Sequence, residues 1–355
     1  MPIKPDYDDG TPKYNKTVRE SYRRLQYRTC TYSQPPKSGE GVRLGVYQAQ
    51  ADCGDGAVEK NISRLEGALK DAADRGVQVL SFPELYLQGY TQSPESAMAT
   101  AVTVESDPIQ KCCTAAKANG VAVIMGYGEK LDRKDKKPLY YDSIVVIGDD
   151  GKVLLNYRKT QLYAEQERVD WSFGMDIPTV FKVNDFPIGV LNCYENEFPE
   201  LVRVLALQGA KLIVGPTAAD GYYKLAKTGE RSDVPYPDVS KKLLPAFAYS
   251  NNLFYAYSNR CGYEERDGSQ WHYRGNSIII DPHGDILVEA EHERDTMLVA
   301  DCIPEYYGDT HPEPEFGYLQ DRRPDLYKML LDKKVDFQKG GYTYPGYDED
   351  GKEKK

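Results

Sequence analysis

Apolar residues follow two spacings along this chain, and segments with each spacing alternate. Short apolar runs have the length of buried strands, whereas longer segments place apolar residues three and four positions apart, as one face of a helix does. A strand is expected at 42–47, a helix at 57–75 and a second strand at 77–82. Gly76 ends the helix between the two strands. This order of strand, helix and strand predicts an α/β domain.

The same order continues to about residue 300, with hairpins inserted between the strand–helix units. Further strands are expected at 121–126, 187–191, 212–214, 253–257 and 297–300, and further helices at 108–119, 198–208 and 239–250. Turns rich in Asp, Gly and Pro at 149–151 and 282–285 each join two strands, which makes those pairs antiparallel. We therefore predict one α/β domain with a mixed sheet.

Both ends of the chain differ in pattern from the middle. Residues 1–40 are polar and rich in Tyr and Pro, and we expect an extension outside the core with a short helix near 17–27. From residue 332 onward the chain is charged and rich in Gly and Tyr, which predicts a tail that is mobile at its tip. The expected division is therefore an N-terminal extension at 1–40, a main domain at 41–331 and a C-terminal tail at 332–355.

Charge and cysteine usage narrow the classes of function. A net charge of −10 argues against binding to nucleic acid or to an anionic membrane. No apolar run approaches the roughly 18 residues that a membrane span needs, and residues 1–40 contain no apolar segment of the signal-peptide type. The 7 cysteines include no C-x-x-C pair, which is typical of a reducing compartment. We expect a cytoplasmic protein.

Three reactive side chains each follow an apolar strand. Glu84 comes directly after the strand at 77–82, where partial burial would raise its pKa and make it a useful general base. Lys159 lies in the segment 156–163 and can stabilise an oxyanion, and Glu167 could orient its ammonium group. Each residue taken alone is more often an ordinary solvated strand end.

Cys193 follows the strand at 187–191 and precedes the helix expected at 198. The positive end of a helix favours the thiolate form of a nearby cysteine. The backbone N–H after such a nucleophile is also well placed to bind an oxyanion. A lone cysteine in this position is nevertheless more often a buried structural residue.

Taken together, the three segments resemble the nitrilase superfamily of carbon–nitrogen hydrolases. Its motifs match Pro83-Glu84 after a strand, Tyr157-Arg158-Lys159 with Leu162, and Cys193-Tyr194-Glu195 with Phe198-Pro199-Glu200. The resemblance covers about 42–327. It implies an αββα sandwich of two mixed sheets flanked by helices, and an αββααββα arrangement in a homodimer or larger homo-oligomer.

The resemblance also implies the chemistry. Cys193 would be the nucleophile that forms a thioester, Glu84 the general base and acid, Lys159 the oxyanion donor with the Tyr194 backbone N–H, and Glu167 the orienting glutamate. A small amide would be hydrolysed to carboxylate and ammonia without metal or cofactor. Tyr194 stands where true nitrilases usually carry Trp, which favours amides over nitriles, although N-carbamoyl compounds and nitriles remain alternatives. The expected substrate-binding residues are Tyr86, Tyr90, Tyr194, Thr217 and Ala218.

Other classes of protein fit less well. A Cys–His protease would need one of the four histidines, and His272 stays open because such groups meet in space and not in sequence. The histidines and cysteines lack the spacing of a zinc site. A nitrilase-like protein that has lost catalysis and serves in interactions is the alternative from another class. The complete set of Glu84, Lys159, Glu167 and Cys193 argues against it.

Overall fold

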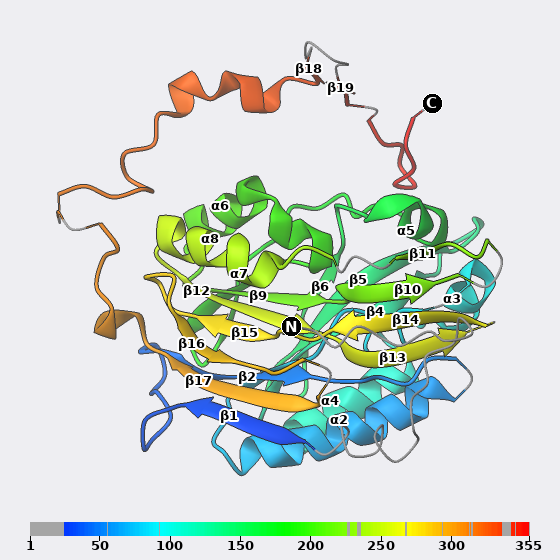
Figure 1. Cartoon of the computed structure of the whole chain (residues 1–355), viewed down its shortest axis with the longest axis horizontal. Helices are drawn as coiled ribbons and strands as arrows, with labels where there is room; N and C mark the ends of the chain where they lie inside the picture. The colour runs from blue at the N-terminus through cyan, green and yellow to red at the C-terminus, as the bar shows by residue number, and fades with distance from the viewer. Residues whose placement is uncertain are drawn as a thin grey trace.

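Two β-sheets pack face to face, and helices cover their outer faces (Figure 1). This computed structural model describes residues 25–354, apart from 55, 92, 226–227, 233–235, 267, 293, 312, 314, 336–341 and 345. One sheet contains, in spatial order, β1 (Gln26–Cys30), β17 (Thr296–Cys302), β2 (Val42–Gln48), β3 (Val79–Ser81), β4 (Ala122–Leu131), β5 (Leu139–Ile147) and β6 (Val153–Arg158). The other contains β16 (Ile286–Glu289), β15 (Ile278–Ile280), β12 (Phe254–Asn259), β9 (Leu212–Thr217), β8 (Phe186–Val190) and β7 (Phe181–Val183).

Alternation along the strands explains how the layers form. Leu44 and Val46 of β2 and Val214 of β9 belong to the core between the sheets, whereas Ile213 of β9 and Tyr255 of β12 point outward. Helices α2 (Ala57–Ala73) and α4 (Asp107–Asn119) cover the outer face of the first sheet, and α6 (Pro199–Leu207) and α8 (Leu244–Asn251) cover the second. The expected αββα sandwich is confirmed.

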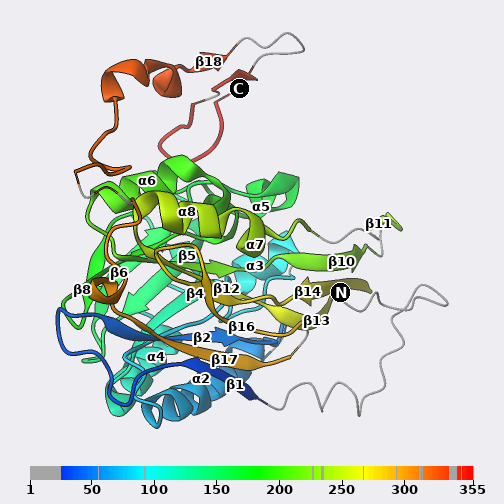
Figure 2. The ribbon, with the colours of Figure 1, turned by 60° about the vertical axis from the view of Figure 1, so that its left-hand side comes forward.

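Strand direction brings several strand ends to one edge. β2, β3 and β4 are parallel, and β6 returns to the same direction after the antiparallel β5. β8, β9 and β12 are parallel in the other sheet. The chain then continues from β9 and β12 into a four-stranded sheet at one end of the sandwich (Figure 2), which sequence reasoning did not predict. Its strands are β11 (Arg231–Ser232), β10 (Asp220–Lys224), β14 (Ser269–Arg274) and β13 (Cys261–Arg266).

Most helix bounds follow local signals. α4 carries Pro in its first turn and ends at Gly120, whose φ of 61° glycine adopts at no steric cost. The single helix expected at 239–250 is instead α7 (Val239–Lys242) followed by α8. Pro245 lacks a backbone N–H and fits only in a first turn, so a new helix begins at Leu244. The other α-helices of the described residues are α3 (Pro94–Thr100) and α5 (Ala164–Asp170).

The N-terminal extension contributes to the fold where the structure describes it. β1 pairs in parallel with β17, from Gln26 opposite Thr296 to Cys30 opposite Ala300. This stretch therefore adds an edge strand to the sheet, although four of its five residues are exposed, and the expected division at residue 40 stays a prediction. The helix expected near 17–27 falls mostly outside the described residues, and its described end belongs to β1.

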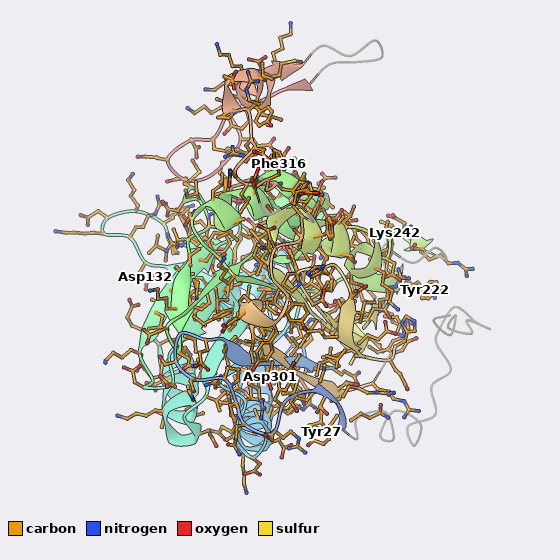
Figure 3. The ribbon with its side chains drawn as sticks, turned by 90° about the vertical axis from the view of Figure 1, so that its left-hand side faces the viewer. Tyr27, Asp132, Tyr222, Lys242, Asp301 and Phe316 are labelled. Atoms are coloured by element: carbon orange, nitrogen blue, oxygen red, sulfur yellow. The ribbon has the colours of Figure 1, made fainter. Side chains whose placement is uncertain are left out.

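The C-terminal segment leaves the body and then returns to it. Phe316 lies where the segment departs, at the opposite end of the molecule from Tyr27 of β1 (Figure 3). The segment forms the short turns η3 (Pro324–Leu326) and η4 (Lys328–Leu331) and the pair β18 (Lys334–Val335) and β19 (Tyr342–Thr343).

The tip then packs beside α5. The Phe173 N–H donates to the Gly351 carbonyl at 3.0 Å, and Lys352 Nζ donates to the Trp171 carbonyl at 3.0 Å. The C-terminal tip is therefore in contact with the body, while its expected mobility and the boundary at 331 stay predictions. Among the described residues, no helix is both long and apolar enough to cross a membrane.

Candidate active site

Glu84, Lys159 and Cys193 meet at the edge where the parallel strands of both sheets end. Glu84 follows β3, Lys159 follows β6 and Cys193 follows β8. Glu84 and Lys159 are completely buried, and Lys159 Nζ lies 2.6 Å from Glu84 Oε1. Ligand and catalytic sites of α/β folds commonly form at such carboxyl ends. The structure therefore brings together the three side chains that the sequence singled out.

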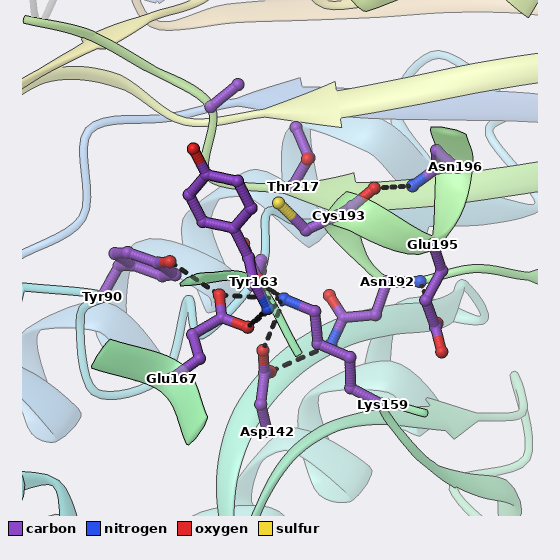
Figure 4. Close-up of polar contacts among 12 residues, drawn as sticks. Tyr90, Asp142, Lys159, Tyr163, Glu167, Asn192, Cys193, Glu195, Asn196 and Thr217 are labelled. Carbon is purple, nitrogen blue, oxygen red and sulfur yellow. Dashed lines mark hydrogen bonds and ion pairs between the residues drawn. The ribbon is translucent and has the colours of Figure 1, made fainter. Parts of the chain in front are cut away.

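Two more carboxylates surround the Lys159 ammonium (Figure 4). Glu167 on α5 accepts from Nζ at 2.8 and 3.0 Å, and Asp142 Oδ2 lies 3.3 Å away. Burial alone would lower the pKa of Lys159, but Glu167, Glu84 and Asp142 together raise it well above its ordinary value. Lys159 is therefore a permanent cation at neutral pH.

Asp142 was not anticipated from the sequence. It lies in the middle of β5 and is fully buried, with Oδ1 accepting from Asn192 Nδ2 at 2.9 Å. The available signal was an acidic residue in an otherwise apolar strand. Oxygens of Glu84, Asp142 and Glu167 lie within 4.8 Å of one another, a spacing that could hold a metal ion. The Lys159 ammonium lies among them and supplies the balancing charge.

The environment of Glu84 makes its carboxylate a stronger base than it would be in water. Burial raises its pKa well above the ordinary value, Lys159 opposes this, and Asp142 and Glu167 add to it. Oε1 contacts Lys159, whereas Oε2 has no hydrogen-bond partner among the described residues. The second oxygen is thus available to receive a proton.

Arg260 fixes the backbone around Glu84. Its Nη2 donates to the carbonyl oxygens of Glu84 and Leu85, both at 2.8 Å, and its Nη1 pairs with Glu264. Leu85 adopts a φ of 44°, and Gly126 allows the loop to approach because a Cβ there would lie 2.4 Å from the Leu85 nitrogen. Sequence reasoning missed Arg260 because its partners lie far away along the chain.

Cys193 opens a short 3-10 turn, η1 (Cys193–Glu197), with a strained φ of 48°. Asn196 Nδ2 donates to its carbonyl at 2.8 Å (Figure 4). Burial raises the pKa of the thiol well above its ordinary value, Glu84 adds to this, and Lys159 opposes it. The helix α6, which begins at Pro199, was expected to favour the thiolate form, whereas burial and the nearby carboxylates favour the protonated thiol.

Glu195 joins the Lys159 segment to the Cys193 turn. Its Oε1 accepts from the Tyr157 hydroxyl at 2.7 Å and from the Thr160 N–H and hydroxyl at 2.7 and 2.6 Å. Its Oε2 accepts from the Asn192 N–H at 2.8 Å. This fully buried carboxylate therefore holds the two segments that flank Lys159 and Cys193 in one arrangement.

A cavity of about 660 Å³ opens beside Cys193, and Tyr90, Tyr194 and Ala218 line it, while their role in substrate binding stays a prediction. Thr217 does not line it, because its hydroxyl points to the Tyr257 hydroxyl at 3.2 Å. Tyr86 packs in the core with its ring centroid 4.8 Å from that of Phe82, so its expected place in the pocket is corrected. The lining residues that were not anticipated include Tyr163, Glu165, Glu197, Tyr223, Glu230, Tyr236, Tyr257 and Trp271.

His272 faces away from the cavity. It lies between the rings of Tyr222 and Tyr263, with centroids at 6.0 and 4.5 Å. Its neighbour on β14, Trp271, lines the cavity, and adjacent strand residues point to opposite faces. The geometry therefore gives no support to a Cys–His pair.

Comparison with known proteins agrees with this arrangement. The sequence model of the family described as carbon-nitrogen hydrolase matches residues 43–312. The chain belongs to the carbon-nitrogen hydrolase family. A protein of Pseudomonas protegens, described as a hydrolase in the pqqF 5' region, is 32% identical over 290 residues, which cover 81% of this chain and 92% of that protein. An N-carbamoylputrescine amidase of Arabidopsis thaliana is 28% identical over 304 residues, or 82% of this chain and 97% of that protein.

Solved structures of this carbon-nitrogen hydrolase type share the fold. A variant of the amidase from Nesterenkonia sp. AN1, of the nitrilase superfamily, has a TM-score of 0.63 at 27% identity and covers 84% of this chain and 99% of its own. Another variant carries the acetamide moiety of fluoroacetamide on its active-site cysteine, with a TM-score of 0.64 at 26% identity over 84% of this chain and 100% of its own. The expected place in the amidase-like branch of the nitrilase superfamily, and the expected enzyme class, are confirmed.

Proposed function

We propose that this carbon-nitrogen hydrolase cleaves small linear amides to carboxylate and ammonia through a thioester on Cys193. The observation that carries the proposal is the contact of Glu84 with Lys159 at 2.6 Å, beside the cavity that exposes Cys193. Cys193 lines this cavity, and Glu84 and Lys159 lie behind it, close enough for both charges to act on the thiol. Acyl transfer to a thiol requires these three groups.

In the first half of the reaction, the Cys193 sulfur attacks the amide carbon while the thiol proton passes to Glu84. The carbonyl oxygen becomes an oxyanion, which Lys159 Nζ and the Tyr194 backbone N–H stabilise. Glu84 then returns the proton to the amide nitrogen. The C–N bond breaks, ammonia leaves, and a thioester joins the acyl group to Cys193.

In the second half, water attacks the thioester while Glu84 accepts its proton. The S–C bond then breaks and the carboxylic acid leaves. Glu84 returns the proton to the Cys193 sulfur, which restores the resting thiol. Glu167 keeps the Lys159 ammonium in position through both halves by its contacts at 2.8 and 3.0 Å.

N-carbamoyl hydrolysis is a second candidate. The relatives include N-carbamoylputrescine amidases of several plants and a citrullinase of Francisella tularensis at 28% identity. A carbamoyl group presents the same carbonyl carbon and terminal amide nitrogen to Cys193. Tyr194 next to the nucleophile favours both classes over nitriles.

Ammonia release from linear amides, N-carbamoyl compounds and nitriles tests the proposal. We expect amides or carbamoyl compounds to give much higher kcat/KM than nitriles, and mass spectrometry to find the acyl group on Cys193. Cys193→Ala should abolish turnover, whereas Cys30→Ala, which removes an exposed thiol elsewhere, should not. Equal or faster turnover of nitriles contradicts the amidase assignment, and full activity of Cys193→Ala contradicts the mechanism. The absence of any turnover or acylation would favour the non-catalytic alternative.

We also propose that the protein is a cytoplasmic homodimer or larger homo-oligomer. All seven cysteines are free thiols, which suits a reducing compartment. Leu326, Met329, Leu330 and Leu331 on the departing C-terminal segment are 65–83% exposed, and a second copy would bury them. Light scattering that finds a 40.1 kDa monomer at micromolar concentration contradicts this assembly.

A further inference from the structure

The charged side chains that line the cavity are all acidic among the described residues. Three carboxylates line it, those of Glu165, Glu197 and Glu230, whereas none of its described lining residues is Lys, Arg or His. Alternation on β10 explains part of this, because Tyr223 lines the cavity and Lys224 points to the other face. The nearby cation Lys159 is already surrounded by carboxylates. In the part of the chain that the structure describes, the cavity lining therefore carries negative charge and no positive charge.

Of the three carboxylates that line the cavity, Glu197 is the closest in sequence to the nucleophile. It ends the η1 turn that Cys193 begins, and a 3-10 helix rises about 2 Å per residue, which separates the two by about 8 Å along the axis. Glu197 is half-buried and accepts a hydrogen bond from the Tyr236 hydroxyl, but it forms no ion pair with a described cation. Burial raises its pKa, as expected for a carboxylate without a balancing charge.

Aromatic rings form the wall around this carboxylate. Tyr163 packs edge-on against Tyr236 with centroids 5.6 Å apart, and against Tyr194 with centroids 5.4 Å apart. Trp271 lines the same cavity from β14. Aromatic faces attract ammonium groups and do not attract carboxylates. The wall and the carboxylate thus favour the same kind of ligand.

From this we infer that the enzyme selects substrates carrying a protonated amine at the end remote from the scissile bond, with Glu197 as the specificity-determining residue. The inference rests on the proposed function and names the substrate class for that same site. Because Glu197 lies one turn beyond Cys193, the ammonium group binds several ångströms from the reacting carbonyl, and a methylene spacer joins the two. The tyrosine wall encloses that spacer.

Three primary amides with the same methylene spacer test the charge preference. δ-Aminovaleramide ends in an ammonium group, hexanamide in a methyl group and adipamate in a carboxylate, and matched N-carbamoyl compounds extend the series. We expect kcat/KM for the ammonium compound to exceed that for the methyl compound about 10- to 100-fold, the range for a hydrogen bond to a charged group. Equal or higher kcat/KM for hexanamide or adipamate overturns the inference and leaves the hydrolytic function standing.

Glu197→Gln tests the assigned residue. The ratio of kcat/KM for δ-aminovaleramide to that for hexanamide should fall about 10- to 100-fold, because the amide keeps the shape and loses the charge. Glu66→Gln is the matched control, since it removes the same charge from the exposed face of α2, and it should leave the ratio unchanged. An unchanged ratio in Glu197→Gln with a native circular dichroism spectrum overturns the role of Glu197.

A binding readout separates the two proposals. Iodoacetamide alkylation of Cys193 in the unmodified protein is followed by mass spectrometry, with the exposed Cys30 as internal reference. Pentylammonium should slow alkylation of Cys193 at concentrations where pentanoate does not. Equal protection by both ions, or protection by neither, overturns the inference. If pentylammonium protects Cys193 while no amide or carbamoyl compound is cleaved, the hydrolytic proposal fails and the ammonium subsite stands.

Discussion

Replacing Glu195 by Gln tests whether this residue positions the catalytic groups without touching substrate. The carboxylate accepts four hydrogen bonds, three at Oε1 and one at Oε2. Glutamine offers one acceptor oxygen and one donor amide group. If its oxygen keeps the three contacts at Oε1, its amide nitrogen faces the Asn192 N–H, and two donors meet.

The expected loss of folding stability in Glu195→Gln follows from these contacts. Losing one hydrogen bond to a charged group costs about 1.5–3 kcal/mol, and an unsatisfied buried N–H costs about 1–3 kcal/mol. Burial raises the pKa of Glu195, and a neutral amide avoids the penalty of burying charge, which offsets part of the loss. We expect a destabilisation of about 2–4 kcal/mol. A displacement of about 1 Å between catalytic groups costs about 100-fold in rate, so kcat should fall at least tenfold.

Urea unfolding and steady-state kinetics on the best amide measure the two effects. The kcat of the folded variant should fall while KM changes less, because Glu195 lies outside the cavity lining. Glu66→Gln on the exposed face of α2 serves as the control and should shift stability by less than about 0.5 kcal/mol. Wild-type stability together with wild-type kcat in Glu195→Gln would refute the bridging role.

Three further predictions concern the proton chemistry. Glu84→Gln should abolish turnover, whereas His272→Ala should retain it if the variant remains folded by circular dichroism; the opposite result would assign the base to histidine. For the uncharged substrate hexanamide, kcat/KM should fall on acidification with a midpoint above pH 4.5, the ordinary pKa of glutamate, because burial raises the pKa of Glu84. This midpoint belongs to the coupled catalytic groups and not to Glu84 alone. Full activity down to pH 4.5 would contradict the raised pKa. Burial and Glu167 raise the pKa of Asp170 from 3.8 to about 7, so the folded state holds its proton more tightly than the unfolded state, and this stabilisation is lost as pH rises through 7. The Tm of Asp170→Asn minus the Tm of the wild type should therefore be larger at pH 8 than at pH 4, as measured by differential scanning fluorimetry. The same Tm difference at both pH values would disprove the raised pKa of Asp170.

Local patterns were sufficient to predict the layers and the three reactive groups. Leu44, Val46 and Val214 follow the strand period, and Glu84, Lys159 and Cys193 each end an apolar run. Strand ends in parallel sheets meet at one edge, so their convergence follows from topology.

The missed residues depend on contacts across long stretches of chain. Arg260 stabilises a loop 175 residues earlier, and nothing near Arg260 in the sequence identifies that partner. Strands β10 and β14, which contribute Tyr223 and Trp271 to the cavity lining, mix Tyr, Trp, Lys and Gln without a clear alternation of apolar and polar residues. No strand was therefore predicted there. Tyr86 follows Glu84 closely but turns into the core, because Leu85 reverses the chain at positive φ.

The position of β17 has a consequence for synthesis of the chain. β17 lies between β1 and β2, and it pairs Cys302 with Val42 and Thr296 with Gln48. Until residue 302 has left the ribosome, β2 therefore presents an open edge whose seven residues are all buried in the finished protein. Unpaired apolar edges recruit other strands. A fragment that ends before β17 should therefore expose this edge and aggregate more readily than the full chain.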